Sequence, residues 1–341
     1  MQSENRRDLV ALPKAHLHLH FTGSMRIGTL ADLAAQHGIP LPEALTEAWP
    51  PRLHATDERG WFRFQRLYDL ARSCVRGEAD LRRLVHEAAE DDAAEGSRWL
   101  EIQVEPTSYA PFVGGLTPAL EIILDEARAA TREVGIGVAV VVAASRVRHP
   151  LDARTLARLA VRYAGSQPGD VVGFGLSNDE RRGALLDFVP AFEIARRGGL
   201  ALVPHAGELL GPASVQDTLT VLRPDRIGHG VRCVEDPRVM DEVADAEVTL
   251  EVCPGSNVSL GSIRRRRTSR CALSWRPGSP WHSARTTPSS SARGCSRSMR
   301  WPARISGSTT STSPPSLQPA CAAAGHPATS SRRRSTTSTG G

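Results

Sequence analysis

The stretch with the plainest chemical potential is Leu12–Met25, which reads LPKAHLHLHFTGSM. In a strand, side chains alternate between faces, so His16, His18 and His20 are expected to share one face. Two imidazoles spaced i, i+2 at a strand end can hold one metal ion, and neutral imidazole is the commonest metal ligand in proteins. Gly23 then lets the chain turn tightly beside the metal. Taken alone, the pattern is equally compatible with an accidental histidine cluster on an exposed edge strand.

Two later segments also carry a histidine at the end of an apolar run. Val203–Leu210 reads VPHAGELL, in which His205 offers a third ligand and Glu208 offers a carboxylic acid near it. An acid beside a metal ion can protonate a purine ring nitrogen, as hydrolysis of a purine amine requires. In Arg226–Gly230, RIGHG, His229 can polarise the attacking water. The alternatives are a helix-capping role for Glu208 and a buried structural role for His229.

A fourth segment, Leu250–Gly261, reads LEVCPGSNVSLG and resembles a strand that ends at a Pro–Gly turn. Cys253 is expected to pack rather than to act as a nucleophile, because no partner base can be named. None of the six cysteines forms a C-x-x-C pair, which argues against a zinc knuckle or a thioredoxin-type site. Scattered cysteines, no apolar run long enough for a membrane span and a polar N-terminus together predict a cytoplasmic protein.

These segments need a scaffold, and residues 8–260 read as alternating strands and helices. Apolar runs predict strands at Ala15–His20, Trp99–Val104, Gly137–Val142, Val171–Leu176, Leu200–His205, Arg226–His229 and Val248–Val252. Amphipathic stretches predict helices at Glu78–Glu95, Leu116–Val134 and Asp152–Tyr163. The alternation indicates a parallel α/β fold. Only seven strand–helix units are found, whereas a closed barrel of this kind needs eight.

The C-terminal segment, residues 262–341, has a different composition. It holds 14 Arg, 19 Ser and 10 Thr with no Lys, Asp or Glu, which is typical of a disordered tail. The other 28 of the 42 basic residues face all 37 acids, so the body carries a net charge near −9 and the tail near +14. A basic arm that binds nucleic acid is one interpretation. Against it, the tail offers only Trp275, Trp281 and Trp301 for stacking on bases.

The order of the four motifs is more specific than any one of them. PKAHLHLHFTG, HAGE, RIGHG and CPGSN follow one another, each at a strand end, and together they resemble adenosine deaminase and its close relatives. The resemblance covers roughly residues 10–261. It implies a (β/α)8 TIM-type barrel with one zinc ion per subunit and a purine nucleoside as its small-molecule partner. Cytidine-type deaminases use H-x-E with P-C-x-x-C, and neither is present.

The resemblance also implies roles for individual residues. His18, His20 and His205 correspond to zinc ligands, whereas His16 does not correspond to a ligand. Glu208 corresponds to the proton donor to the purine ring. The RIGHG histidine, His229, corresponds to the residue that orients the zinc-bound water. The implied reaction is the hydrolytic deamination of adenosine or a related 6-aminopurine nucleoside to the 6-oxo product and ammonia.

Two departures from the family pattern bear on the substrate. The resemblance places His20, Thr22 and Asn178 among the substrate contacts. Thr22 stands where the family usually has an acid that contacts the sugar, and the usual A-G-D-E segment reads Ser177-Asn178-Asp179-Glu180. Adenine and aminodeoxyfutalosine-like nucleosides therefore stay open as alternative substrates. The oligomeric state is also left open.

One family element is absent from the chain as written. The family's zinc-binding Asp-Asp pair ends the eighth strand in a T/A-D-D-P motif, yet residues 262–341 contain no Asp. When the codons of Arg276–Gly294 are read one base out of frame, with G or C chosen at most free third positions, the stretch can read A-G-V-P-V-A-L-G-A-D-D-P-L-L-F-G. Lys14 is the single lysine among 42 basic residues, which supports a GC-rich gene. We infer that the reading frame shifts near Arg264–Arg267.

The resulting expectation is a deaminase barrel over residues 1–261, truncated or unclosed at the eighth strand, followed by a disordered, frameshifted tail over 262–341. Such a barrel leaves unpaired strand edges and lacks the zinc carboxylate. Three histidines can still hold zinc. The literal chain is therefore expected to fold poorly and to show little activity, and an inactive pseudoenzyme is an alternative interpretation.

Overall fold

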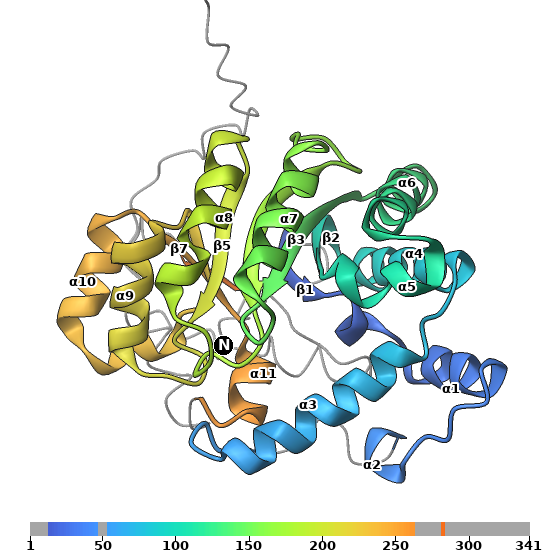
Figure 1. Cartoon of the computed structure of the whole chain (residues 1–341), viewed down its shortest axis with the longest axis horizontal. Coiled ribbons are helices and arrows are strands. Elements are labelled where there is room, and N and C mark those ends of the chain that lie inside the picture. The colour runs from blue at the N-terminus through green and yellow to red at the C-terminus, as the bar shows by residue number, and fades with distance from the viewer. Residues whose placement is uncertain (1–12, 47–52, 263–280, 284–341) are drawn as a thin grey trace, which may run out of the picture. The chain divides into compact units, whose positions relative to one another are not determined.

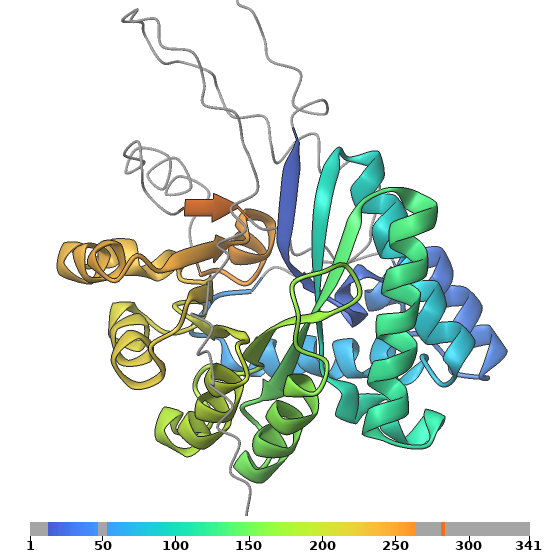
Figure 2. The same ribbon diagram turned by 90° about the horizontal axis from the view of Figure 1, so that it is seen from above.

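The strands of the protein form one parallel sheet that curves into a nearly closed barrel. The computed structural model describes residues 13–46, 53–262 and 281–283. The strands lie in chain order from β1 to β8, with every neighbouring pair parallel (Figures 1 and 2). They are β1 (Lys14–His20), β2 (Ser97–Val104), β3 (Gly137–Ser145), β4 (Val171–Ser177), β5 (Ala201–Ala206), β6 (Arg226–His229), β7 (Thr249–Val252) and β8 (Trp281–Ser283). The predicted TIM-type α/β fold is confirmed.

Helices follow the strands and cover the outer face of the sheet (Figure 2). They are α1 (Ile27–Gln36), α2 (Glu43–Thr46), α3 (Glu58–Ser73), α4 (Glu78–Ala94), α5 (Ala110–Val113), α6 (Leu116–Val134), α7 (Pro150–Val161), α8 (Leu185–Arg197), α9 (Pro212–Leu222), α10 (Pro237–Asp245) and α11 (Pro254–Ser259). Short 3-10 turns lie at Thr22–Ser24, Pro106–Ser108 and Val231–Glu235. None of the described helices is both long and apolar enough to cross a membrane.

The hydrophobic core lies mainly between the first five strands and their helices. Strand β3 reads GVAVVVAAS and is buried along almost its whole length, as expected for a parallel strand covered on both faces. Helix α6 buries Leu120, Ile123 and Leu124 along one face, which is why its apolar positions recur at helical spacing. This core gives the sheet a rigid base on which the strand ends are held.

The eighth position of the barrel holds a strand of three residues. Leu250, Glu251 and Val252 of β7 pair in parallel with Trp281, His282 and Ser283 of β8. Among the described residues no ladder joins β8 to β1, so the barrel is nearly closed rather than closed. We did not expect a strand here, because residues 262–341 lack a hydrophobic period. The expected disorder of that tail concerns residues that, apart from Ser262 and β8, lie outside the described part of the chain.

The first strand departs from regular alternation. His16 pairs with Leu100 and Leu19 with Ile102, so β1 contains one extra residue between these two points. Such a bulge moves the preceding side chain to the other face of the sheet. His16 accordingly contacts Asp92 of α4, at 2.9 Å between Nδ1 and Oδ2, while His18 faces the other histidines. The expectation that His16, His18 and His20 share one face is wrong for His16.

Candidate functional site

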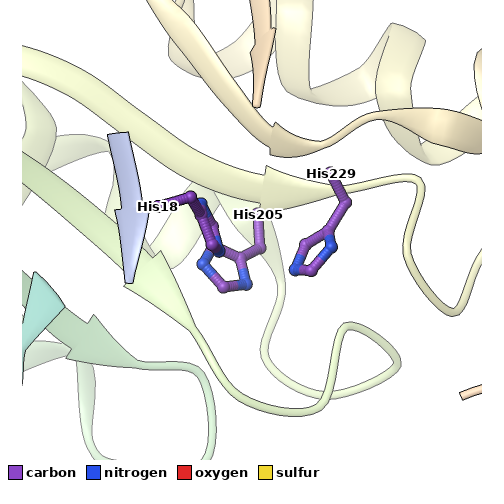
Figure 3. A group of neighbouring side chains, drawn as sticks. All are labelled: His18, His205 and His229. Atoms are coloured by element: carbon purple, nitrogen blue, oxygen red, sulfur yellow. The ribbon is translucent and has the colours of Figure 1, made fainter. Parts of the chain in front are cut away.

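Four histidines from three strands gather at the carboxyl ends of the strands. The ring centroid of His18 lies 5.1 Å from that of His20, 4.6 Å from that of His205 and 4.9 Å from that of His229. One ligand nitrogen from each of His18, His205 and His229 lies within 4.8 Å of the other two, which makes this group able to hold a metal ion (Figure 3). His20 lies beside the group, with its ring centroid 5.1 Å from that of His205.

His18 is oriented by a buried chain of charges. Its Nδ1 donates to Glu251 Oε2 at 2.7 Å, and neither side chain is exposed. The other Glu251 oxygen lies 3.1 Å from Arg226 Nη1, and Arg226 Nη2 donates to Glu101 Oε2 at 2.6 Å. A carboxylate that holds one ring nitrogen fixes the tautomer and directs the lone pair of the other nitrogen outward. His18 Nε2 is buried and has no hydrogen-bond partner among the described residues.

The other two histidines have neutral partners. His205 Nε2 lies 3.0 Å from Gln103 Oε1, which accepts its proton and leaves the lone pair on Nδ1. Asn257 Oδ1 accepts from the amide of Cys253, so the Asn257 side-chain nitrogen donates to His229 Nδ1 at 3.0 Å. The proton of His229 is then on Nε2. His205 therefore offers a free lone pair, whereas His229 offers a hydrogen-bond donor.

Burial keeps these imidazoles neutral. Desolvation, with smaller contributions from the charges of His16 and Arg226, lowers the pKa of His18 to about 3. Burial also holds the pKa values of His20, His205 and His229 well below the usual value near 6.5, and in each case charge on neighbouring histidines adds to the effect. Metal binding needs neutral imidazole, so the cluster is in the protonation state that a metal requires.

The RIGHG segment lets the rings approach one another. A β-carbon at Gly228 would lie 2.7 Å from both His18 Cε1 and His205 Cδ2, so a side chain at this position would displace the two histidines. The next residue, His229, has φ of 66°, in the left-handed region that residues with a β-carbon rarely occupy. Strain of this kind persists where the surrounding structure fixes it, and it is frequent at functional sites.

Glu208 lies beside the histidines with its carboxyl group shielded from water. Its Oε1 is 3.3 Å from His229 Nε2, and its Oε2 is 3.9 Å from His205 Nδ1. Burial, reinforced by the negative charges of Glu180 and Asp179, raises the pKa of Glu208 to about 8. At neutral pH the group is therefore largely protonated and can act as an acid.

The two predicted substrate contacts other than His20 lie in different surroundings. Thr22 is buried, and its Oγ1 lies 2.7 Å from the hydroxyl of Tyr109. Asn178 has φ of 76° and lines a cleft of about 890 Å³ between α3 and the end of β4. Trp61 of α3 lines the same cleft and packs against Leu209, the residue next to Glu208.

Sequence reasoning missed the partners that orient the histidines. Glu251, Gln103 and Asn257 were not singled out, although all three are buried. A signal was present for two of them, because Glu251 and Gln103 are polar residues inside strand segments that were predicted to be buried. Such residues are buried only when they have a partner.

Comparisons with known proteins show which family this chain resembles over most of its length. Residues 13–269 match the family model described as adenosine deaminase. A Streptomyces virginiae protein named "Putative adenosine/adenine deaminase" is 64% identical over 262 residues, which cover 77% of this chain and 76% of that protein. The structure of adenine deaminase from Arthrobacter aurescens is 26% identical with a TM-score of 0.67, covering 76% of this chain and 79% of that one. An amidohydrolase from Burkholderia ambifaria, solved with bound zinc, is 26% identical with a TM-score of 0.69, covering 82% of this chain and 77% of that one.

Proposed function

Because the chain belongs to the adenosine deaminase family, we propose that it deaminates a 6-aminopurine by hydrolysis. Water adds to C6 of the purine, the C6–N bond breaks, and the 6-oxopurine and ammonia leave. The reaction needs an acid that gives a proton to the ring, and a group that aligns the water. Both needs can be met by residues of the histidine cluster and its neighbour Glu208.

The observation that carries the proposal is the buried carboxyl group of Glu208, whose Oε1 lies 3.3 Å from His229 Nε2. Burial and the nearby charges of Glu180 and Asp179 raise the pKa of Glu208 to about 8, so Glu208 is expected to hold a proton at neutral pH. Donation to the ring nitrogen beside C6 makes that carbon more electrophilic. His229, whose Nε2 carries a proton and lies 3.3 Å from Glu208, can donate a hydrogen bond to the attacking water.

The donor set fits zinc. His18 Nε2 is buried without a hydrogen-bond partner in the described part of the chain, and the lone pair of His205 Nδ1 is free. We propose that these two nitrogens and His20 are the protein ligands. His229 is excluded from the set because its lone pair accepts from Asn257. When bound, zinc supplies Lewis-acid chemistry that brings the pKa of water towards ~7.

Zinc content and turnover test the proposal together. The full chain is incubated with zinc, its metal content is measured, and adenosine, adenine and aminodeoxyfutalosine are followed by the loss of adenine absorbance. His18→Ala is expected to lose zinc, whereas His229→Ala is expected to keep it and lose turnover. Glu208→Gln is expected to retain zinc with kcat lowered ~10²–10⁴-fold. Because the chain as written lacks the zinc carboxylate, the same assays are run on a chain translated in the alternative frame after about Arg264. Zinc-loaded protein of that chain that turns over none of these purines would contradict the proposal.

Adenine is a second candidate substrate beside adenosine. In the family the residue before Gly23 is usually an acid that contacts the sugar, and here it is Thr22. The Thr22 hydroxyl is already hydrogen-bonded to Tyr109, so it has less capacity to bind a sugar hydroxyl. A kcat/KM for adenine above that for adenosine would support the base as the substrate.

A further inference from the structure

The segment that carries Glu208 is held by one carboxylate from a neighbouring loop. Glu180 follows β4, and both of its oxygens point at the chain that leaves β5. Its Oε1 accepts from Gly207 N at 2.6 Å and from Ser214 Oγ at 2.5 Å. Its Oε2 accepts from the backbone amides of Glu208 at 3.0 Å, Leu209 at 2.6 Å and Leu210 at 2.9 Å.

Four successive amides that converge on one side chain leave the segment little freedom. A backbone amide buried without a partner is costly, so each bond to Glu180 penalises any movement of residues 207–210 away from it. Gly207 has φ of 65°, and a β-carbon there would lie 3.2 Å from Gly230 Cα, which shows how tightly the turn approaches the β6 loop. The turn places Glu208 Oε1 3.3 Å from His229 Nε2.

We infer that Glu180 is a positioning residue for Glu208: it fixes the 207–210 turn so that the Glu208 carboxyl faces the histidine cluster. The inference rests on the proposed role of Glu208 as proton donor. Glu180 itself contacts the backbone of the turn and not the reacting atoms. Proton transfer depends steeply on alignment, and a misplacement of about 1 Å can cost ~100-fold in rate. Glu180 holds the turn that carries the proton donor Glu208 through five hydrogen bonds. Loss of these bonds is therefore expected to lower kcat.

The test replaces one acceptor oxygen by a donor. In full-length Glu180→Gln, an NH2 group opposes some of these donors, so amide hydrogen exchange at residues 207–210 is expected to accelerate ~10-fold or more while exchange in β3 stays unchanged. Zinc content should not change, and kcat should fall ~100-fold with KM altered less than ~3-fold. Ser214→Ala removes a single donor and is the milder variant, with a smaller acceleration centred on Gly207.

Two control variants separate positioning from charge and from general stability. Asp179→Asn removes a negative charge near Glu208 without touching the turn amides, so exchange at 207–210 should match that of the parent. Asp80→Asn changes another buried carboxylate, which accepts from Arg76 N at 2.8 Å, and should leave the kcat of the folded protein unchanged.

Unchanged exchange at 207–210 in both Glu180→Gln and Ser214→Ala would overturn the inference. So would a loss of kcat in Asp80→Asn as large as that in Glu180→Gln. If neither the parent chain nor a chain translated in the alternative frame after about Arg264 turned over a 6-aminopurine, the proposed function would fail. The exchange comparison would then still decide whether Glu180 holds the turn.

Discussion

The two sides of the barrel are built differently. Strands β1 to β4 contain seven to nine residues and pack against the large core cluster. Strands β6 and β7 contain four residues each and contribute to a small separate cluster that includes Ile227, Val239 and Leu250, and β8 contains three residues. Strand β5 joins the two sides, since Ala201–Pro204 pair with β4 while His205 and Ala206 pair with β6.

The candidate site lies across this junction. Strand β1 of the long-stranded side supplies His18 and His20, and the joining strand β5 with the turn after it supplies His205 and Glu208. These are the groups proposed to bind metal and to donate a proton. The short-stranded side supplies His229 and Glu251, of which one is proposed to align the water and the other orients His18. The proposed chemistry therefore also depends on the side of the barrel that has the smaller core cluster and the shortest described strand.

The largest expected effect comes from completing the short-stranded side. A chain in which codons after about Arg264 are read in the alternative frame would carry the Asp-Asp pair after β8. Loss of a supporting partner of a metal ligand costs ~10–100-fold, so restoring a ligand should raise kcat/KM for a 6-aminopurine by more than ~100-fold. It should also raise the melting temperature, because the exposed edge of the barrel would be closed. Sequencing the gene across codons 260–300, and then comparing both proteins, is the measurement.

The outcome also decides the status of residues 262–341. If genomic sequence and the mass of the mature protein both confirm the present frame, the frameshift hypothesis is wrong. A normal deaminase rate in the literal chain would show that three histidines suffice. The difference between the two sides of the barrel would then affect the stability of the fold but not the rate of the reaction.

The sequence predicted local features, such as the bounds of helices and strands, better than contacts between distant residues. The helix Leu116–Val134 and the strand Arg226–His229 have the same bounds in prediction and structure, because hydrophobic periodicity is a local property. The orientation of His16 was missed, since one bulged residue reverses the alternation without any mark in the sequence. Glu251 was missed as the partner of His18, from which it is 233 positions distant, because only the curvature of the sheet brings β7 near β1.

The next prediction compares the two side chains that hydrogen-bond to proposed zinc ligands, one from each side of the barrel. Glu251 of β7 holds His18 through a charged hydrogen bond, and Gln103 of β2 holds His205 through a neutral one. Charge-assisted hydrogen bonds are roughly twice as strong as neutral ones, so Glu251→Gln should weaken zinc affinity by ~10–100-fold and Gln103→Leu by less. Competition with a zinc chelator measures both. Equal losses would indicate that the metal depends on both sides alike.

A smaller effect is expected on how the stability of the metal-free protein depends on pH. Glu208 has a folded-state pKa raised to about 8, so its contribution to stability is full below its ordinary value near 4.5 and is lost as pH rises through 8. The buried histidines have lowered pKa values, so their contribution is present above about pH 6.5 and is lost as pH falls. Opposed trends predict a stability maximum near neutral pH. Thermal unfolding from about pH 5 to 9 should show it, and Glu208→Gln should remove the decline between about pH 6.5 and 8 and steepen the rise below pH 6.5.

The smallest expected difference is between the stabilities lost when one buried leucine is replaced in the large cluster and one in the small cluster. Leu100 of β2 and Leu250 of β7 are both fully buried, but Leu100 belongs to the large cluster and Leu250 to the small one. The cost of Leu→Ala depends on how far the surroundings relax into the cavity, and it reaches ~5 kcal/mol where they cannot relax. We expect about 4 kcal/mol for Leu100→Ala and about 2.5 kcal/mol for Leu250→Ala, because short strands at an open edge relax more readily. Denaturant unfolding of both variants measures the difference, and a larger loss in Leu250→Ala would mean that the short-stranded side limits the stability of the whole barrel.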